Sequence, residues 1–155
     1  MAKGTLYTIS APSGCGKTSL VKALLERMQH IGVSVSHTTR DMRPGEVDGV
    51  DYHFINADRF LEMIHGGEVL EHAQVCRNYY GTSEGAVEAM LNADQDVILE
   101  IDWQGMQQVQ KLRPDSVAIT ILPPSLAALQ SRLQGRDSDT DEEIAHRMSQ
   151  AREEM

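Results

Sequence analysis

The chain has 155 residues, a length typical of one domain with small insertions. Charged residues at 24% and hydrophobic residues at 41% are ordinary for a soluble globular protein. The formal net charge of −9 argues against a protein that coats nucleic acid, because such a protein needs a basic surface. No apolar run reaches the roughly 18 residues of a membrane span, and residues 1–4 lack a signal-peptide pattern. We therefore expect a cytoplasmic protein with no membrane partner.

A glycine-bearing turn between an apolar strand and an amphipathic helix organises the sequence. Residues 5–10 (TLYTIS) are β-prone, residues 11–16 (APSGCG) form the turn, and Lys17-Thr18 begins the helix. Glycines in the turn let successive backbone N–H groups converge on a phosphate, and the helix dipole adds attraction. This context is typical of a phosphate-binding loop, although Ala11 replaces the usual first glycine. The predicted ATP-binding residues are Ser13, Gly14, Cys15, Gly16, Lys17, Thr18 and Ser19.

Two residues of this loop carry specific chemistry. Lys17 is placed to reach the β- and γ-phosphates of ATP, and the Thr18 hydroxyl can ligate Mg²⁺. The expected cofactor is therefore Mg²⁺, bound together with ATP.

Hydrophobic periodicity predicts alternating helices and strands after the loop. Leu20, Leu24, Met28 and Ile31 recur at helical spacing, so we expect a helix that Gly32 ends, followed by a strand at 33–36. Further helices are expected at 57–64 with Asn56 as its cap, at 83–92, 104–112 and 125–133, and from a capping box at 140–143 onward. Further strands are expected at 51–55, 69–75, 79–82, 97–102 and 116–122, and those at 69–75 and 79–82 could pair as a hairpin that turns at 76–78.

This order of elements favours an α/β fold: a P-loop NTPase core with a parallel sheet flanked by helices. Residues 36–84 interrupt the βα alternation as a small α+β insertion. The apolar strand at 97–102 ends in a carboxylate, which suits a buried strand whose carboxyl end faces the nucleotide. Because the sequence stops at Met155 inside a helical pattern, we expect that a C-terminal part is missing.

Taken together, the motifs resemble the guanylate kinase family, whose members transfer phosphate from ATP to GMP. The resemblance covers essentially the whole chain. It implies a P-loop core at 1–35 and 85–124, a GMP-binding insertion at 36–84, a helical lid at 125–147, and the start of a returning core helix at 148–155. Its motifs are APSGCGKT at 11–18, SHTTR at 36–40, RPGE at 43–46, DY at 51–52, Glu71, NYYGT at 78–82, IDWQG at 101–105 and RLQGR at 132–136.

The resemblance also implies which residues bind GMP. Arginine suits the GMP phosphate because its planar fork makes bidentate bonds to phosphate oxygens. Glu71 matches the guanine reader: a carboxylate can accept from N1–H and the N2 amine of guanine, whereas adenine presents an acceptor at N1. The phosphate contacts are Arg40, Arg43, Tyr52 and Tyr80 with Ser36 beside them, and the base contacts are Glu71, Thr82 and Asp102.

The sequence leaves two roles open for Asp102. It matches a guanine contact, but it could instead support Mg²⁺ through water, and Glu100 could lie on the same face of the strand. The implied catalytic set comprises Lys17, Arg40 and the lid arginines Arg132, Arg136 and Arg147, which would stabilise charge on the transferring phosphoryl group. No general base is indicated, because the acceptor is already a phosphate oxyanion.

Two alternatives compete with a GMP kinase. Asp102-Trp103-Gln104-Gly105 fits the D-x-x-G pattern of a P-loop GTPase, but the 36–84 insertion indicates a second nucleotide site. A non-catalytic guanylate-kinase-like binding module would be expected to lack the loop lysine or the lid arginines, and this chain has both. The expected partners are ATP and GMP, and a homo-oligomer is compatible with the sequence.

Overall fold

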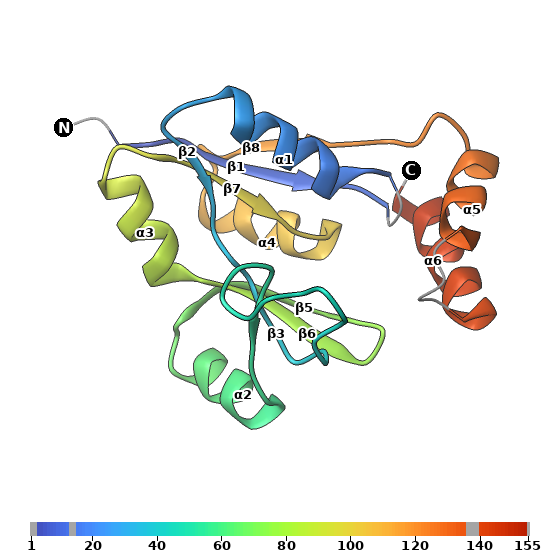
Figure 1. Cartoon of the computed structure of the whole chain (residues 1–155). Coiled ribbons are helices and arrows are strands. Elements are labelled where there is room, and N and C mark those ends of the chain that lie inside the picture. Colours follow the sequence, from blue (N-terminus) through green and yellow to red (C-terminus); the bar gives the residue numbers. More distant parts are fainter. Residues whose placement is uncertain (1–2, 13–14, 136–139, 155) are drawn as a thin grey trace.

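The computed structural model describes residues 3–12, 15–135 and 140–154, and one of its two sheets is a four-stranded parallel sheet (Figure 1). Its strands are β1 (Leu6–Ser10), β2 (Ile31–Val33), β7 (Asp96–Glu100) and β8 (Val117–Thr120), in the order β2-β7-β1-β8. Helix α1 (Lys17–Arg27) covers one face, and α3 (Glu84–Asn92) and α4 (Trp103–Leu112) cover the other (Figure 1). The predicted α/β class with a helix-flanked parallel sheet is confirmed.

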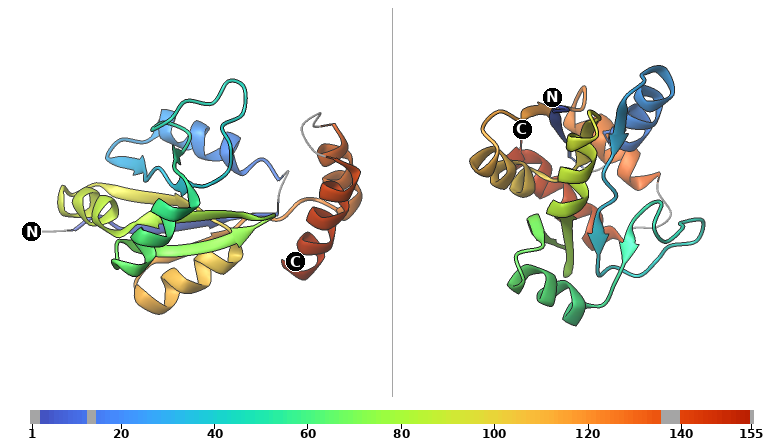
Figure 2. Two further views of the ribbon diagram at one scale, coloured as in Figure 1. Left: turned by 90° about the horizontal axis from the view of Figure 1, so that it is seen from below. Right: turned by 90° about the vertical axis from the view of Figure 1, so that its left-hand side faces the viewer.

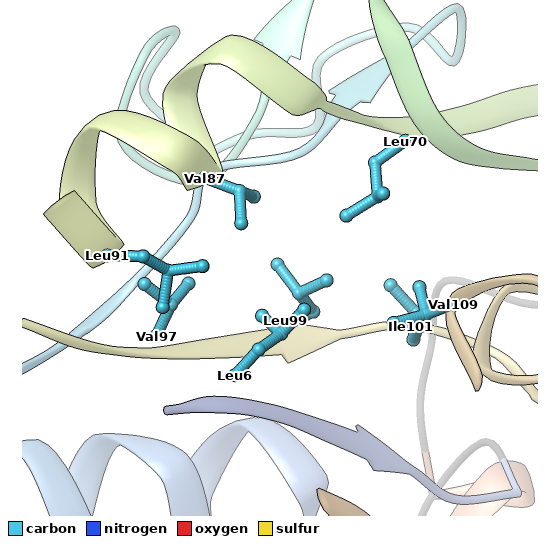
Figure 3. Packing of buried hydrophobic residues seen from close by; sticks show 8 residues of the cluster. All are labelled: Leu6, Leu70, Val87, Leu91, Val97, Leu99, Ile101 and Val109. Atoms are coloured by element: carbon cyan, nitrogen blue, oxygen red, sulfur yellow. The ribbon is translucent and has the colours of Figure 1, made fainter. Parts of the chain in front are cut away.

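Alternate residues of β7 supply the two sides of the core. Ile98 packs towards α1 with Ile9 and Val21, and all three are buried. On the opposite face, buried residues from both sheets and from α3 and α4 form a second cluster (Figure 3). Its members are Leu6, Leu70, Val87, Leu91, Val97, Leu99, Ile101 and Val109. Because Leu70 belongs to the second sheet, this cluster fixes that sheet against the first.

The second sheet is built from the predicted insertion. Its strands are β3 (His37–Thr38), β4 (His53–Phe54), β5 (Val69–Val75) and β6 (Asn78–Ser83), in the order β4-β3-β6-β5. Strands β5 and β6 form the predicted hairpin, whose turn holds Cys76 and Arg77 at φ values of 49° and 75°. Helix α2 (Ala57–His65) begins at Asn56, whose side chain accepts from the Arg59 N–H at 2.8 Å, and buries Phe60 against this sheet.

Strand β5 has one irregularity that matters for the site. Val69 pairs with Ser83 and Glu71 pairs with Thr82, so the register shifts at Leu70. Such a bulge places two residues of one strand opposite one of its partner and re-aims the side chains. Leu70 therefore enters the core cluster while Glu71 lies directly opposite Thr82.

The C-terminal helices form a hairpin at one end of the molecule (Figure 2). Helices α5 (Leu126–Gln134) and α6 (Asp141–Glu154) enclose a separate apolar cluster of Leu129, Leu133, Ile144, Met148 and Ala151. The predicted capping box begins α6: the Glu143 N–H donates to Thr140 Oγ1 at 3.2 Å, and the Thr140 N–H donates to the Glu143 carboxylate at 2.7 Å. No helix among the described residues is long and apolar enough to cross a membrane.

The segment after α1 differs from the prediction. The helix ends at Arg27 rather than at Gly32, Met28 is extended, and the strand β2 spans 31–33 instead of 33–36. Leu20 and Met28 are 51% and 49% exposed, so the predicted apolar stripe is wrong at both positions. Gly32 lies in the strand, and a Cβ there would collide with the side chains of Gln95 and Met90, which explains the glycine at this position.

Further strands differ from the prediction in extent: β4 covers 53–54 instead of 51–55, β7 covers 96–100 instead of 97–102, and β8 covers 117–120 instead of 116–122. Strand β3 was not predicted. Strand β8 lies at the edge of its sheet, where Val117 and Ile119 are each 41% exposed. These short strands are defined by their partners in the sheet, which periodicity does not report.

Thr8 is completely buried in β1. No residue that the structure describes forms a hydrogen bond with its hydroxyl. We expect Thr8→Val to raise the free energy of unfolding by about 1 kcal/mol, because it removes an unsatisfied polar atom without changing the volume. Urea denaturation measures this change.

Thr38→Val is the matched control. The Thr38 side chain is equally buried, but its hydroxyl donates to the Tyr79 carbonyl at 3.0 Å and accepts from the Arg40 N–H at 3.1 Å. This control should lose about 1–3 kcal/mol. A loss of stability in Thr8→Val comparable to that in Thr38→Val would contradict the prediction.

Candidate functional site

A cleft of about 530 Å³ lies where the carboxyl ends of the parallel strands face the second sheet. It is lined from four directions: the turn before α1, the ends of β2 and β7, the second sheet with its loops, and α6. Thirteen of the sequence-predicted site residues line it: Cys15, Gly16, Lys17, Thr18, Ser19, Ser36, Arg40, Arg43, Tyr52, Glu71, Tyr80, Asp102 and Arg147. Thr82 lies buried behind Glu71, and Arg132 is exposed on α5 outside the cleft. Ser13, Gly14 and Arg136 lie outside the described residues.

The turn before α1 has the geometry of an anion site. Gly16 precedes the helix with φ 79° and ψ 22°, a left-handed conformation that a side chain disfavours. Lys17 is the first helical residue, and it lines the cleft beside the helix N-terminus. The Cys15 N–H donates to the Pro12 carbonyl at 3.2 Å and tightens the turn. The positive end of α1 therefore faces the cleft together with a lysine.

Glu100 contacts the first turn of α1. The Thr18 hydroxyl donates to Glu100 Oε2 at 3.2 Å, across the end of β7. From the sequence, Glu100 was expected only to share a face of the strand with Asp102. Asp102 instead caps α4: its Oδ1 accepts from the Gly105 N–H at 2.9 Å, and its Oδ2 accepts from Gln104 Nε2 at 3.1 Å.

Arg40 is held by an acidic partner that sequence reasoning missed. Its Nη1 and Nη2 donate to the two carboxylate oxygens of Glu46, both at 2.9 Å, and Nη1 also donates to the Asp41 carbonyl at 2.9 Å. The guanidinium lies 5.3 Å from the Tyr52 ring centroid and 5.8 Å from that of Phe54. Three of its five N–H groups are thus used. The Nε–H and one Nη2–H have no partner among the described residues, and they form a fork of the kind that binds phosphate.

Glu46 also shapes the loop that carries the second arginine. Its carboxylate accepts from the Arg43 backbone N–H at 2.7 Å, and the Glu46 N–H donates back to the Arg43 carbonyl at 3.1 Å. Hydrogen bonding to Arg40, followed by the bond from Arg43, holds the pKa of the Glu46 carboxyl below its usual range. Glu46 therefore stays ionised and keeps Arg40 oriented. The signal for it was the RPGE motif, in which only the arginine received a role.

Hydroxyl groups complete this side of the cleft. The rings of Tyr52 and Tyr80 lie 5.9 Å apart, edge to face. Burial raises the pKa of the Tyr52 hydroxyl, so it remains protonated and able to donate. Ser34, just beyond β2, also lines the cleft and is only 3% exposed, and no described residue hydrogen-bonds its hydroxyl. Sequence reasoning selected Ser36 and passed over Ser34.

Glu71 is a buried carboxyl group whose hydrogen-bond partner, among the residues that the structure describes, is Thr82. It is 3% exposed, and the Thr82 hydroxyl donates to its Oε1 at 2.6 Å. Burial raises the pKa of Glu71 to about 7, and the charge of nearby Asp102 adds to this effect. A carboxylate in this position is under-solvated, so it favours a ligand that brings further N–H donors.

The structure describes two of the three predicted lid arginines, and one of them lines the cleft. Arg147 of α6 is half-buried and lines the cleft together with Gln150, whereas Arg132 points to solvent from α5. Cys15, in the turn before α1, packs against the apolar cluster between α5 and α6. The helical hairpin therefore adjoins the anion site, with Arg147 in the cleft and Arg132 and Arg152 outside it.

Comparison with known proteins identifies the family. The guanylate kinase family matches residues 3–155. The chain is 59% identical to a guanylate kinase of Chromohalobacter salexigens, over 99% of this chain and 72% of the relative. It is 58% identical to a guanylate kinase of Alcanivorax borkumensis, over 99% of this chain and 74% of the relative. The crystal structure of guanylate kinase from Anaplasma phagocytophilum is similar with a TM-score of 0.76 and 31% identity, over 99% of this chain and 87% of that one.

These findings decide between the alternatives left by the sequence. They favour the kinase over a P-loop GTPase and over a non-catalytic module, since the relatives are named as enzymes and Lys17 lines the cleft. The sequence-based prediction of the family and of its reaction is confirmed. The chain belongs to the guanylate kinase family and is an enzyme that transfers phosphate from ATP to GMP.

Proposed function

We propose that the cleft binds ATP with Mg²⁺ at the N-terminus of α1 and GMP against the second sheet, so that the γ-phosphoryl group passes directly between them. One observation carries this proposal. A lysine-bearing helix start and an arginine fork line the same cleft, and the buried carboxylate of Glu71 lies on the arginine side. Two anion sites with one base-reading group suit a donor and an acceptor nucleotide. We extend the proposal to the cytoplasm, where both nucleotides are available.

The GMP phosphate would bind to the unused edge of Arg40. The Nε–H and Nη2–H point along one edge of the guanidinium, and two parallel bonds to phosphate oxygens fix distance and direction together. Arg43 would add charge from an exposed position, and Tyr52, Tyr80 and Ser36 line the same wall and would donate hydroxyl hydrogens. This half of the site needs little rearrangement, because Glu46 already orients Arg40.

The guanine base would be read by Glu71. Its carboxylate would accept from N1–H and from the N2 amine, two donors that supply the solvation its burial removes. Thr82 keeps Oε1 in place, and Asp102 would contact the amine from the end of β7. Adenine would present an acceptor to a carboxylate, so it is rejected by repulsion as well as by a missing bond.

The donor side would use Lys17, Thr18 and Glu100. Mg²⁺ prefers oxygen ligands and usually takes one or two from the protein, with the rest from phosphates and water. The hydrogen-bonded Thr18 hydroxyl and Glu100 carboxylate fit that chemistry. When bound, the metal would neutralise charge on the transferring phosphates, and Lys17 would share that role.

Transfer would be completed by closure of the segment 125–147 as a lid over the core. Arg147 already lines the cleft, and Arg132 and Arg136 would join it as the lid closes. Their positive charges would stabilise the equatorial oxygens of the phosphoryl group, and closure would exclude water as a competing acceptor. Because the acceptor is an oxyanion, no proton needs to be removed, and positioning supplies most of the rate.

We expect ADP formation from ATP with GMP but not with AMP, and a KM for GMP that rises as pH falls through about 7. The reason is that a protonated Glu71 turns one acceptor into a donor that opposes the N1–H of guanine. Glu71→Gln should lower kcat/KM for GMP by ~10²-fold. Steady-state kinetics across this pH range test both expectations.

The GMP phosphate itself titrates near pH 6, roughly as a phosphorylated side chain does, so the pH dependence that remains in Glu71→Gln supplies the baseline. Equal pH dependence in both proteins would exclude Glu71 as the titrating group.

Without GMP and above pH 7, the free energy of unfolding of Glu71→Gln should exceed that of the parent by about 3 kcal/mol. The parent loses stability as pH rises from 4.5 to about 7, because its folded state holds a proton that the unfolded state has released.

Glu46→Ala should lower kcat/KM for GMP by roughly 10- to 10²-fold and leave the KM for ATP within about twofold, because Arg40 loses its orientation. Glu46→Gln keeps the shape of the side chain, so its kcat/KM for GMP should lie between the values of Glu46→Ala and the parent. Glu62→Ala removes a carboxylate that is 70% exposed in an ion pair with Arg59, and serves as the control. An unchanged KM for GMP in Glu46→Ala would show that Arg40 needs no such support.

A Mg²⁺ titration should distinguish the roles of Glu100, at the end of β7, and Asp102, two residues beyond it. Glu100→Gln should raise the Mg²⁺ concentration for half-maximal rate by about tenfold with the KM for GMP unchanged, since Glu100 contacts Thr18. Asp102→Asn should raise the KM for GMP instead. The reverse pattern would assign the metal to Asp102 and the proposal would be wrong at this point.

A further inference from the structure

A glycine in the first turn of α4 lies directly against the carboxylate of Glu71. Gly105 is buried, and an ideal Cβ built on it would approach Glu71 Oε2 well inside the 3.0 Å limit of real contacts. The same Cβ would lie 3.1 Å from Glu71 Cδ and 3.4 Å from Ile101 Cβ. The space that any other residue would fill is thus occupied by the Glu71 carboxyl group.

The backbone does not explain this glycine. Gly105 lies inside a regular helix and is not among the residues with positive φ. Glycine is the poorest helix former apart from proline, so alanine would favour α4 if space were the same. The requirement therefore comes from the neighbouring carboxylate.

The second carboxylate of the base site also depends on Gly105. Its N–H donates to Asp102 Oδ1 at 2.9 Å. Glu71 Oε2 lies in the space where a Cβ of residue 105 would be. One residue thus contacts both acidic groups, one through its backbone N–H and the other through its missing side chain. Their spacing is set by the first turn of α4.

Glu71 has little freedom to move aside. Its other oxygen is bound by Thr82 at 2.6 Å, and the residue is 3% exposed. The adjacent Leu70 is fixed in the apolar cluster between the sheets (Figure 3). A methyl group at position 105 would therefore drive the carboxylate away from Thr82 or into the cleft.

We infer that Gly105 is a positioning residue that sets guanine specificity, by leaving the space in which the Glu71 carboxylate rests. This inference rests on the proposed role of Glu71 as the base reader. Hydrogen bonds weaken steeply outside about 2.7–3.2 Å, and a misplacement of about 1 Å can cost ~10²-fold in rate. A displaced carboxylate would lose its bonds to guanine while the ATP side stays intact.

The test compares Gly105→Ala with Gly85→Ala. Gly85 is also in the first turn of a helix, and a Cβ there would meet nothing within 4 Å. We expect Gly105→Ala to raise the KM for GMP about tenfold or more and to lower the preference for GMP over AMP, with the KM for ATP within about twofold. Gly85→Ala should match the parent in all three values.

Glu71→Ala and the double variant Gly105→Ala/Glu71→Ala complete the cycle, with GMP affinity measured by calorimetry. If the methyl acts through Glu71, Gly105→Ala should cost nothing in the Glu71→Ala background. An equal cost in both backgrounds, or a Gly105→Ala variant with the parent KM for GMP, overturns the inference. If Glu71→Ala itself leaves GMP affinity unchanged, the proposed base reader is wrong, and the inference falls with it.

Folding of the variants is part of the test. Should Gly105→Ala unfold, the double variant should recover the parent melting temperature, because Glu71→Ala removes the group that the methyl meets. Failure of both to fold would assign the clash to Ile101 and overturn the inference.

Discussion

The hydrogen bond between Thr82 and Glu71 is the interaction on which the proposed GMP site depends. It joins two strands across a bulge, at the only point where the ladder of β5 and β6 shifts its register among the paired residues. The bulge lets Leu70 enter the core and leaves Glu71 opposite Thr82. Packing between the sheets therefore fixes the place of a functional carboxylate. The cost is a buried acid whose pKa is raised to about 7, which disfavours the charged form until donors arrive.

Electrostatics in the cleft solve a problem that the composition sets. A chain with net charge −9 must attract two anionic nucleotides, so its cations have to be concentrated and oriented locally. Arg40 shows how this is done: Glu46 takes one edge of the guanidinium, Tyr52 and Phe54 support its face, and one edge stays available. A counter-ion reduces the attraction of Arg40 for phosphate. In exchange the arginine is held in one orientation, and little side-chain entropy remains to be lost on binding.

Sequence reasoning recovered what local patterns determine. The loop before α1, the hairpin of β5 and β6, the Asn56 cap and the capping box at Thr140 each depend on neighbours within a few residues, and each was predicted. What failed depends on side-chain contacts that no periodicity encodes. Gly32 signals a helix end locally, yet it lies in β2, where the side chains of Gln95 and Met90 leave no room for a Cβ. Thr18 and Glu100 meet across 82 residues of sequence, and Arg40 and Glu46 meet within one loop.

The two halves of the cleft differ in how complete they are. On the acceptor side, Arg40, Glu71 and Asp102 each have defined partners, so that half is formed before any nucleotide binds. On the donor side, the helical hairpin packs mainly on its own apolar cluster and meets the phosphate-binding turn through Cys15. A unit with its own core can shift without opening the rest of the protein, because few contacts have to be exchanged. In the proposed mechanism, specificity for guanine can therefore reside in the rigid half, while the hairpin would control access of water and the arrival of arginines at the phosphoryl group.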